Sequence, residues 1–218
     1  MLIICDLDGT LIDSEGRHLA VLDDLLADRG LPPADEGYLA FKREGRNTRA
    51  YLEAQGIGDP ETRENMCRDW AARIEEERYL RGDRWMEGRC GRVEALRAAG
   101  HRIVILSARK NASWIRSAVR ARFPFLMEQD IRIVSPLRAG AEKAQAVREL
   151  AGDGFGLLIG DTEADWEACR GTRVVPWMLD TGFRSRHFWR AKSIPSHGDL
   201  PTAEQVAEMA REKERPFP

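Results

Sequence analysis

Short runs of purely apolar residues recur along the chain, separated by stretches with helical periodicity. The apolar runs are continuous rather than alternating, which is typical of strands buried on both faces of a parallel sheet. We predict strands at 2–5, 103–106, 131–134, 157–159 and 174–177. Helical patterns cover 93–99, 112–122, 141–150 and 163–169. This alternation predicts an α/β fold with a doubly wound, Rossmann-like parallel sheet.

One long segment after the first strand carries only helical patterns. Stops rich in Gly and Pro stand at 30–33 and 56–60, and 61–80 is predicted to be one long polar helix. An insertion at the C-terminal end of a strand lies where open α/β sheets bind ligands. We therefore expect an α/β core domain made of 1–13 and 87–218, with an inserted all-helical cap domain at 14–86.

The C-terminal part has weaker patterns. A short helix is expected at 183–189 and an edge strand at 192–194. A final helix is expected at 202–211, with Thr202 as its N-cap.

Length and composition narrow the class of protein. The chain has 218 residues, which is enough for one domain with a modest insertion. Its net charge of −2 predicts no strong attraction to nucleic acid or to a membrane. The four cysteines form no CxxC pair, which favours reduced thiols over a zinc site or a disulfide framework. The N-terminal apolar run is too short for a signal peptide or a membrane span, so we expect a cytoplasmic protein.

Acidic residues follow two of the predicted strands. Asp6 and Asp8 come after the first strand, and Gly9 favours a turn that places both in one pocket. Asp161 and Asp165 follow the fourth strand. Carboxylates that lie close together are costly without a cation, and oxygen ligands suit Mg²⁺.

Two residues are suited to binding an anion. Ser107 follows the second strand, where its hydroxyl can donate to a phosphoryl oxygen. Lys143 lies near the start of a helix, where the backbone amides and the helix dipole also favour an anion. Each residue alone has an ordinary explanation, because a strand-end aspartate is often a helix cap and a helix lysine is often solvated. The order of the full set along the chain favours a shared site.

In this order the residues resemble the four motifs of the haloacid dehalogenase-like superfamily. The matching segments are Asp6-Leu7-Asp8-Gly9-Thr10, Ser107, Lys143 and Gly160-Asp161-Thr162-Glu163-Ala164-Asp165. The inserted helices resemble the small helical cap of the phosphoglycolate phosphatase-like members. The segment 181–186 is similar to a Gly-hydrophobic-Arg-Ser run that follows the fifth strand in that group.

The resemblance implies a Mg²⁺-dependent phosphatase that acts on a small-molecule phosphomonoester. Asp6 would be the nucleophile that forms an aspartyl-phosphate, and Asp8 would be the general acid and base. Ser107 and Lys143 would hold the phosphoryl oxygens. The metal would be held by acidic residues, namely Asp6, the backbone carbonyl of Asp8, Asp161 and, through water or by orienting the lysine, Asp165.

Asp8 also separates branches of the superfamily, because a dehalogenase needs no general acid at this position. A phosphomutase of the same superfamily stays an alternative, as does a non-catalytic binding protein that keeps the fold. Candidate substrate-binding residues are Arg46 and Asn47 in the polar stretch 42–49 and Arg109 beyond Ser107. Their alternatives are a solvated turn and a helix cap. The expected partner is a small phosphate ester, the expected state is a monomer or a homodimer, and the sequence does not name the physiological substrate.

Overall fold

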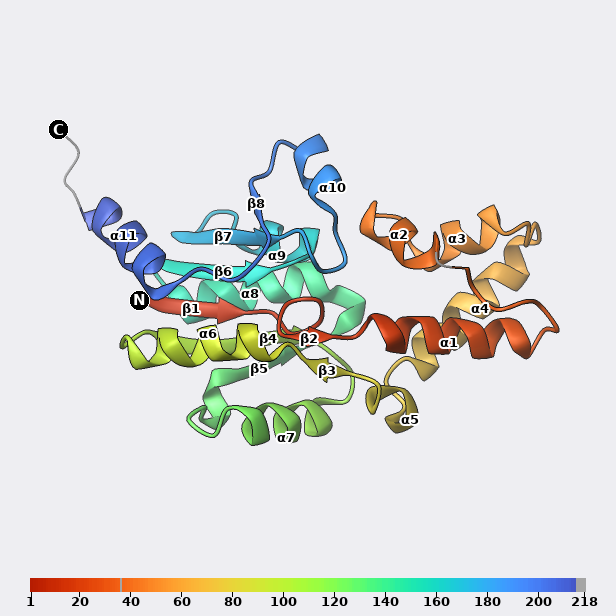
Figure 1. Ribbon diagram of the computed structural model, residues 1–218, viewed down its shortest axis with the longest axis horizontal. Coiled ribbons are helices and arrows are strands. Elements are labelled where there is room, and N and C mark those ends of the chain that lie inside the picture. Colours follow the sequence, from red (N-terminus) through yellow and green to blue (C-terminus); the bar gives the residue numbers. More distant parts are fainter. Residues whose placement is uncertain (36, 215–218) are drawn as a thin grey trace.

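The computed structural model describes residues 1–35 and 37–214, and a six-stranded sheet forms its centre (Figure 1). The strand order is β5-β4-β1-β6-β7-β8, and every pairing in this sheet is parallel. The five predicted strands are confirmed, three of them slightly longer than expected. They are β1 (Leu2–Cys5), β4 (Arg102–Ala108), β5 (Ile131–Val134), β6 (Gly156–Gly160) and β7 (Val174–Leu179).

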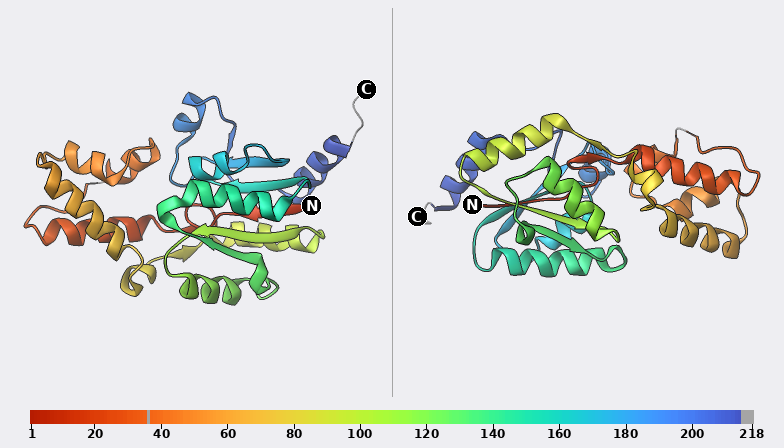
Figure 2. Two further views of the ribbon diagram at one scale, coloured as in Figure 1. Left: turned by 180° about the vertical axis from the view of Figure 1, so that it is seen from behind. Right: turned by 90° about the horizontal axis from the view of Figure 1, so that it is seen from below.

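Helices cover both faces of the sheet because each central strand is apolar on both sides. Ile3 and Cys5 belong to one buried cluster, while Ile4 between them belongs to another. The first cluster includes apolar residues of α6 (Glu87–Ala98), α7 (Ala112–Arg122) and α11 (Ala203–Glu214). The second includes residues of α8 (Ala139–Ala151) and α9 (Glu163–Ala168), which lie across the opposite face in Figure 2. The prediction of a doubly wound parallel sheet is therefore confirmed.

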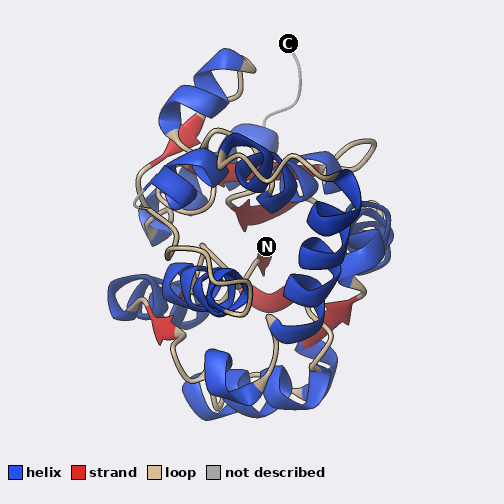
Figure 3. Cartoon of the chain, turned by 90° about the vertical axis from the view of Figure 1, so that its right-hand side faces the viewer, coloured by secondary structure: helices blue, strands red, loops and turns tan. Residues whose placement is uncertain are grey.

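The segment after β1 forms a helical insertion, which we define as helices α1–α5. Viewed from its end of the molecule in Figure 3, these helices lie in front of the sheet. They share a hydrophobic cluster of their own, built from residues such as Leu22, Tyr38, Leu52 and Met66. The helices are α1 (Glu15–Ala27), α2 (Gly37–Arg43), α3 (Thr48–Ala54), α4 (Pro60–Arg73) and α5 (Glu77–Leu80).

Two details of this segment differ from expectation. The predicted single helix over 61–80 is wrong, because the chain breaks at 74–76 between α4 and α5. Within 14–86 there is also a short strand, β3 (Arg84–Trp85), which pairs antiparallel with β2 (Ile12–Asp13). The β2–β3 ribbon brings the two ends of the insertion side by side.

The C-terminal part also departs from expectation. The short helix α10 (Arg186–Ala191) begins later than predicted, and the edge strand β8 is Ser196–His197 rather than 192–194. The chain turns at Ser193, which has a φ of 57°. Thr202 caps α11, with its hydroxyl accepting from the Gln205 amide at 3.3 Å. Residues 215–218 of the expected core domain lie outside the described residues, and no described helix has the length and apolarity to cross a bilayer.

Among its contacts with the sheet domain, the insertion forms hydrogen bonds on two sides. On one side the Ser185 amide donates to the Arg43 carbonyl at 2.9 Å, and the Ser185 hydroxyl lies 2.6 Å from Glu44 Oε1. On the other side Glu75 accepts from the backbone amides of Lys110 and Asn111 at 2.8 and 2.6 Å. The two contacts hold the helices over the C-terminal ends of the central strands.

Candidate active site

The C-terminal ends of β1 and β6 bring three buried aspartates together. The strands are neighbours, and the Asp6 amide donates to the Ile159 carbonyl at 2.9 Å. Asp161 follows β6 directly, and Asp165 stands one turn later on α9. Each of these side chains offers an oxygen atom, and these atoms all lie within 4.8 Å of one another. The structure therefore assembles Asp6, Asp161 and Asp165 as the sequence predicted.

Lys143 on α8 reaches into this cluster. Its ammonium donates to Asp6 Oδ1 and to Asp165 Oδ1, both at 2.6 Å. One ammonium thus faces three buried carboxylates. A divalent cation would supply the two positive charges that the cluster lacks.

The uncompensated charge shifts the acidity of the cluster. Burial, followed by the nearby carboxylates, raises the pKa of Asp6 to about 7 even though Lys143 opposes the shift. Burial also raises the pKa of Asp161 well above its ordinary value, with added repulsion from Asp6 and Asp165. Burial disfavours the charge of Lys143, but the two carboxylates outweigh it and raise the lysine pKa. The protein alone therefore does not favour three ionised carboxylates at neutral pH.

Both carboxylate oxygens of Asp165 accept hydrogen bonds within the protein. While Oδ1 accepts from Lys143, Oδ2 accepts from the amide and the hydroxyl of Thr162 at 3.1 and 2.7 Å. Both of its oxygens are thus engaged by protein donors at the start of α9. Of the two roles expected for Asp165, this geometry supports the orientation of Lys143.

Polar atoms without partners identify the open part of the site. Among the described residues, Ser107 Oγ, Asp161 Oδ1 and Arg109 Nη1 are buried and have no hydrogen-bond partner. Buried polar atoms are rarely left unpaired, so such atoms at one place point to missing ligands. An acceptor beside two carboxylates suits a cation, and the hydroxyl and guanidinium donors suit phosphoryl oxygens. The donor set therefore fits Mg²⁺ together with a phosphate group.

Glycine allows the chain to approach Asp161 closely from two sides. A Cβ on Gly9 would lie 2.1 Å from Asp161 Oδ2, and a Cβ on Gly182 would lie 2.2 Å from the same atom. Gly9 also has a φ of 73°. The next residue, Phe183, donates its amide to Asp161 Oδ2 at 2.5 Å. The 181–186 segment thus fixes one oxygen of Asp161 and leaves the other free.

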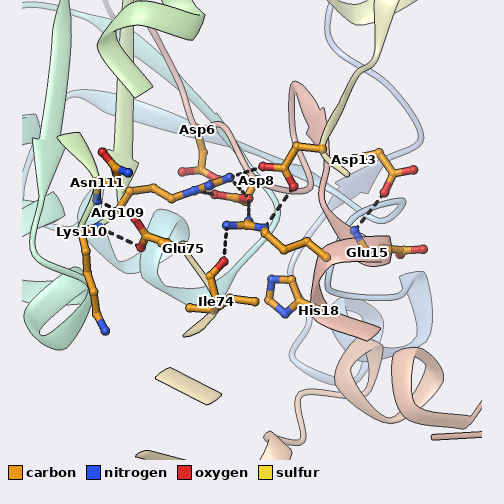
Figure 4. Close-up of polar contacts among 12 residues, drawn as sticks. Asp6, Asp8, Asp13, Glu15, His18, Ile74, Glu75, Arg109, Lys110 and Asn111 are labelled. Atoms are coloured by element: carbon orange, nitrogen blue, oxygen red, sulfur yellow. Dashed lines mark hydrogen bonds and ion pairs between the residues drawn. The ribbon is translucent and has the colours of Figure 1, made fainter. Parts of the chain in front are cut away.

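The Asp8 carboxylate is bound by two arginines, and Figure 4 shows its contact with Arg109. Arg109, which follows β4, donates from Nε to Asp8 Oδ2 at 2.6 Å, and Arg17 of α1 donates to Asp8 Oδ1. Asp83, which follows α5, lies 3.0 Å from both Arg17 Nε and Arg109 Nη2. The four side chains form a closed ring of alternating charge that joins the insertion to the sheet domain.

This ring determines the protonation of Asp8. Burial would raise the pKa of Asp8, but the Arg109 and Arg17 guanidiniums outweigh it and hold that pKa well below its usual range. Asp8 is therefore ionised in the free protein. Sequence reasoning missed Arg17 and Asp83, because one arginine of many and one loop aspartate in the insertion carry no local signal.

The predicted substrate-binding residues lie in different surroundings. Arg109 is buried beside Asp8, as described above. Asn47 is the N-cap of α3, where its side chain accepts from the Ala50 amide at 3.0 Å. Arg46 is exposed, and its guanidinium lies 4.7 Å from the centre of the Phe41 ring. A role for Arg46 or Asn47 in binding substrate stays a prediction.

Comparison with known proteins agrees with this fold. The chain belongs to the haloacid dehalogenase-like hydrolase family, whose sequence profile matches residues 3–170. Among curated proteins, no sequence matches this chain closely enough to count as a relative.

Solved structures show the same architecture at low sequence identity. A putative phosphoglycolate phosphatase from Lactobacillus delbrueckii subsp. bulgaricus is 16% identical, with a TM-score of 0.62 over 95% of this chain and 97% of the other. A HAD family hydrolase from Deinococcus radiodurans R1, with bound phosphate and sodium, is 21% identical, with a TM-score of 0.63 over 97% and 95%. Protein Tyrosine Kinase A from Mycobacterium tuberculosis is 22% identical, with a TM-score of 0.65 over 95% and 96%. At these identities the likeness shows the fold alone.

Proposed function

We propose that this protein is a Mg²⁺-dependent phosphatase that hydrolyses a small-molecule phosphomonoester through an aspartyl-phosphate on Asp6. The observation that carries the proposal is the group of three buried carboxylates around one ammonium, beside the unpartnered Ser107 hydroxyl. The phosphate bound to the Deinococcus radiodurans neighbour supports an anion site in this fold.

In the proposed reaction Asp6 attacks phosphorus and the bond to the leaving oxygen breaks. Ser107 and Lys143 donate to the phosphoryl oxygens and stabilise the charge that develops on them. Water then cleaves the aspartyl-phosphate, which releases phosphate and restores Asp6. The metal would be held by Asp6, Asp161 and the Asp8 carbonyl, with Asp165 acting through Lys143; when bound, it would offset the repulsion between nucleophile and substrate.

Asp8 would protonate the leaving oxygen and later take a proton from the attacking water. In the free protein both of its oxygens accept from arginines, so it is ionised. An incoming phosphoryl group would compete with Asp8 for Arg109, whose Nη1 has no partner among the described residues. We propose that this exchange lets Asp8 take up a proton from the incoming phosphate monoanion or from water, which it then gives to the leaving oxygen.

We propose further that the helical insertion acts as a cap, with residues 14–86 as the cap domain and 1–13 with 87–218 as the core domain. Its own hydrophobic cluster and its hydrogen bonds to the sheet domain on two sides support this division. A cytoplasmic location and a monomeric or homodimeric state stay predictions.

The test is hydrolysis of p-nitrophenyl phosphate with and without Mg²⁺, comparing wild type with Asp6→Asn. Wild type should release free phosphate only with the metal, and Asp6→Asn should lose turnover by about a thousandfold or more because the amide is a poor nucleophile. Asp153→Asn, an exposed aspartate outside the site, is the matched control. Wild-type turnover in Asp6→Asn would refute the proposal. An isomerised sugar phosphate in place of free phosphate would indicate a phosphomutase.

A further inference from the structure

A second group of polar and aromatic side chains lies beside the site, where the insertion meets Phe183 of the sheet domain. Lys42 of α2 lies with its Nζ 2.6 Å from His18 Nδ1 of α1. The same ammonium is 5.1 Å from the centre of the Trp70 ring, 5.5 Å from that of Tyr38 and 5.2 Å from that of Phe183. The His18 ring packs on Phe183 and Trp70, with centroids 4.6 and 5.2 Å apart. We call these five residues the Lys42 cluster.

The ammonium of Lys42 is not paired with a carboxylate among the described residues. It forms no ion pair there, its hydrogen-bond partner is the His18 imidazole, and the negative charge of Asp8 reaches it only from a distance. Trp70 Nε1 in the same cluster is buried and has no hydrogen-bond partner among these residues. Burial, with the nearby positive charges of Arg184 and Arg17, lowers the pKa of Lys42 to about 7. The Lys42 ammonium and the Trp70 indole N–H thus lie in one half-buried cluster without an anionic acceptor among the described residues.

The cluster is joined directly to the catalytic residues. Phe183 places its ring against Lys42, while its backbone amide donates to Asp161. His18 follows Arg17, which binds Asp8, and Figure 4 shows His18 close to this arginine ring of contacts. The leaving group departs from the side of Asp8, because Asp8 is the proposed proton donor. The Lys42 cluster therefore lies on the Asp8 side of the site, close enough for Asp8 to influence the charge of Lys42.

Resting on the function proposed above, we infer that Lys42 is a specificity-determining residue that binds a second anionic group, a carboxylate or a phosphate, on the leaving group of the substrate. Such an oxyanion would accept from the Lys42 ammonium and could also accept from Trp70 Nε1. The aromatic faces would exclude water from the pair, which strengthens the attraction. The preferred substrates are thus phosphomonoesters with two anionic ends.

The experiment compares kcat/KM for three esters: p-nitrophenyl phosphate, a phosphomonoester with a carboxylate on its leaving group, and one with a second phosphate. Wild type should have a higher kcat/KM for one of the two anionic esters than for p-nitrophenyl phosphate. The preferred ester shows whether the second anionic group is a carboxylate or a phosphate. Lys42→Met should lower kcat/KM for that ester by about tenfold or more, the effect of losing one charge-assisted hydrogen bond. The loss on p-nitrophenyl phosphate, which has no second anionic group, should be clearly smaller than the loss on that ester.

Two variants control the interpretation. Lys192→Met removes an exposed lysine whose Nζ lies 5.0 Å from the Phe188 ring, and it should leave all three values unchanged. Lys42→Arg should retain part of the preference because it keeps the charge. An equal loss on all three esters, or no loss on any, would overturn the assignment of Lys42. The assignment of Lys42 would also be wrong if wild type hydrolysed p-nitrophenyl phosphate without favouring either anionic ester. Failure of wild type on every ester would instead refute the phosphatase proposal, and this inference with it.

Discussion

At the scale of single residues, the ionised forms of the three clustered carboxylates, Asp6, Asp161 and Asp165, destabilise the folded state. Asp6 and Asp161 are buried, and Lys143 is the ammonium that both Asp6 and Asp165 bind. A buried carboxylate without a counter-charge takes up a proton more readily than it does in the unfolded chain. The folded state should therefore become less stable as these groups ionise, and a bound cation should remove that penalty.

This gives a pH prediction with a definite sign. Folding raises the pKa of Asp6 from 3.8 to about 7. The stability that this group contributes is therefore fully present below about pH 4 and is lost as the pH rises through about 7. In EDTA, the contribution of the cluster to the free energy of unfolding, measured with urea, should therefore fall as the pH rises from about 4 to about 7. Saturating Mg²⁺ should flatten that contribution, and Asp161→Asn should reduce it in EDTA. Identical pH profiles with EDTA and with Mg²⁺ would contradict the prediction.

The residues that the sequence could predict are those whose position along the chain is informative. Asp6 and Asp161 follow apolar strands directly and Ser107 lies near the end of β4, so their meeting at one edge of the sheet follows from strand order. Arg17, Lys42 and Asp83 reach the site from the insertion, and their place depends on how helices pack onto the sheet domain. No local pattern encodes that packing, so the sequence could not select them.

At the scale of elements, one helix end in the insertion could not be predicted because no Gly or Pro marks it. The break between α4 and α5 falls at Ile74, Glu75 and Glu76, which include no helix-breaking residue. Residues at this break contact groups that are distant in sequence. Arg17 Nη1 donates to the Ile74 carbonyl at 3.4 Å, and Glu75 accepts from the backbone of the loop after β4. Tertiary contacts end this helix.

Gly45 provides a test of how the turn between α2 and α3 meets the sheet domain. Its φ is 79°, and an added Cβ would lie 2.3 Å from Phe188 Cε2. Gly45→Ala should therefore lower kcat/KM several-fold by displacing this turn, besides costing about 1 kcal/mol for the left-handed backbone. Gly56→Ala is the matched control, since its φ is 82° and nothing lies within 4 Å. It should show a similar loss of stability in urea and normal kinetics. Equal kinetics for the two variants would rule out a role for this contact.

At the scale of the whole molecule, the insertion and the sheet domain share the residues that surround Asp8. Glu75 holds the backbone of Lys110 and Asn111, and the preceding residue Arg109 binds Asp8. A change in how the insertion is seated should therefore reach the catalytic acid through this loop. The proposed cap is in this sense part of the active site rather than a separate cover.

Glu75→Gln tests that connection with little change of shape. The amide keeps one acceptor oxygen and loses the charge, so one of the two backbone hydrogen bonds is lost. We expect kcat/KM for p-nitrophenyl phosphate to fall by about tenfold, the effect of losing one hydrogen bond to a charged group. Glu77→Gln is the control, because Glu77 is exposed and its Oε1 pairs with Arg81 Nη2 at 2.7 Å, away from the loop after β4. A Glu75→Gln enzyme with unchanged kinetics would show that the loop does not depend on this contact.

The β2–β3 ribbon has a consequence for how such a protein can diversify. Ile12 pairs with Trp85 and Asp13 pairs with Arg84, so the chain leaves the sheet domain and returns to it through adjacent backbones. A foreign segment of any length can be spliced between two such points if its own ends lie about 5 Å apart. Recombination could thus exchange the whole module that carries Lys42 while Asp6, Lys143 and Asp161 stay in register. Laboratory grafting of modules from distant relatives at residues 13 and 84 would use the same route to new substrate ranges.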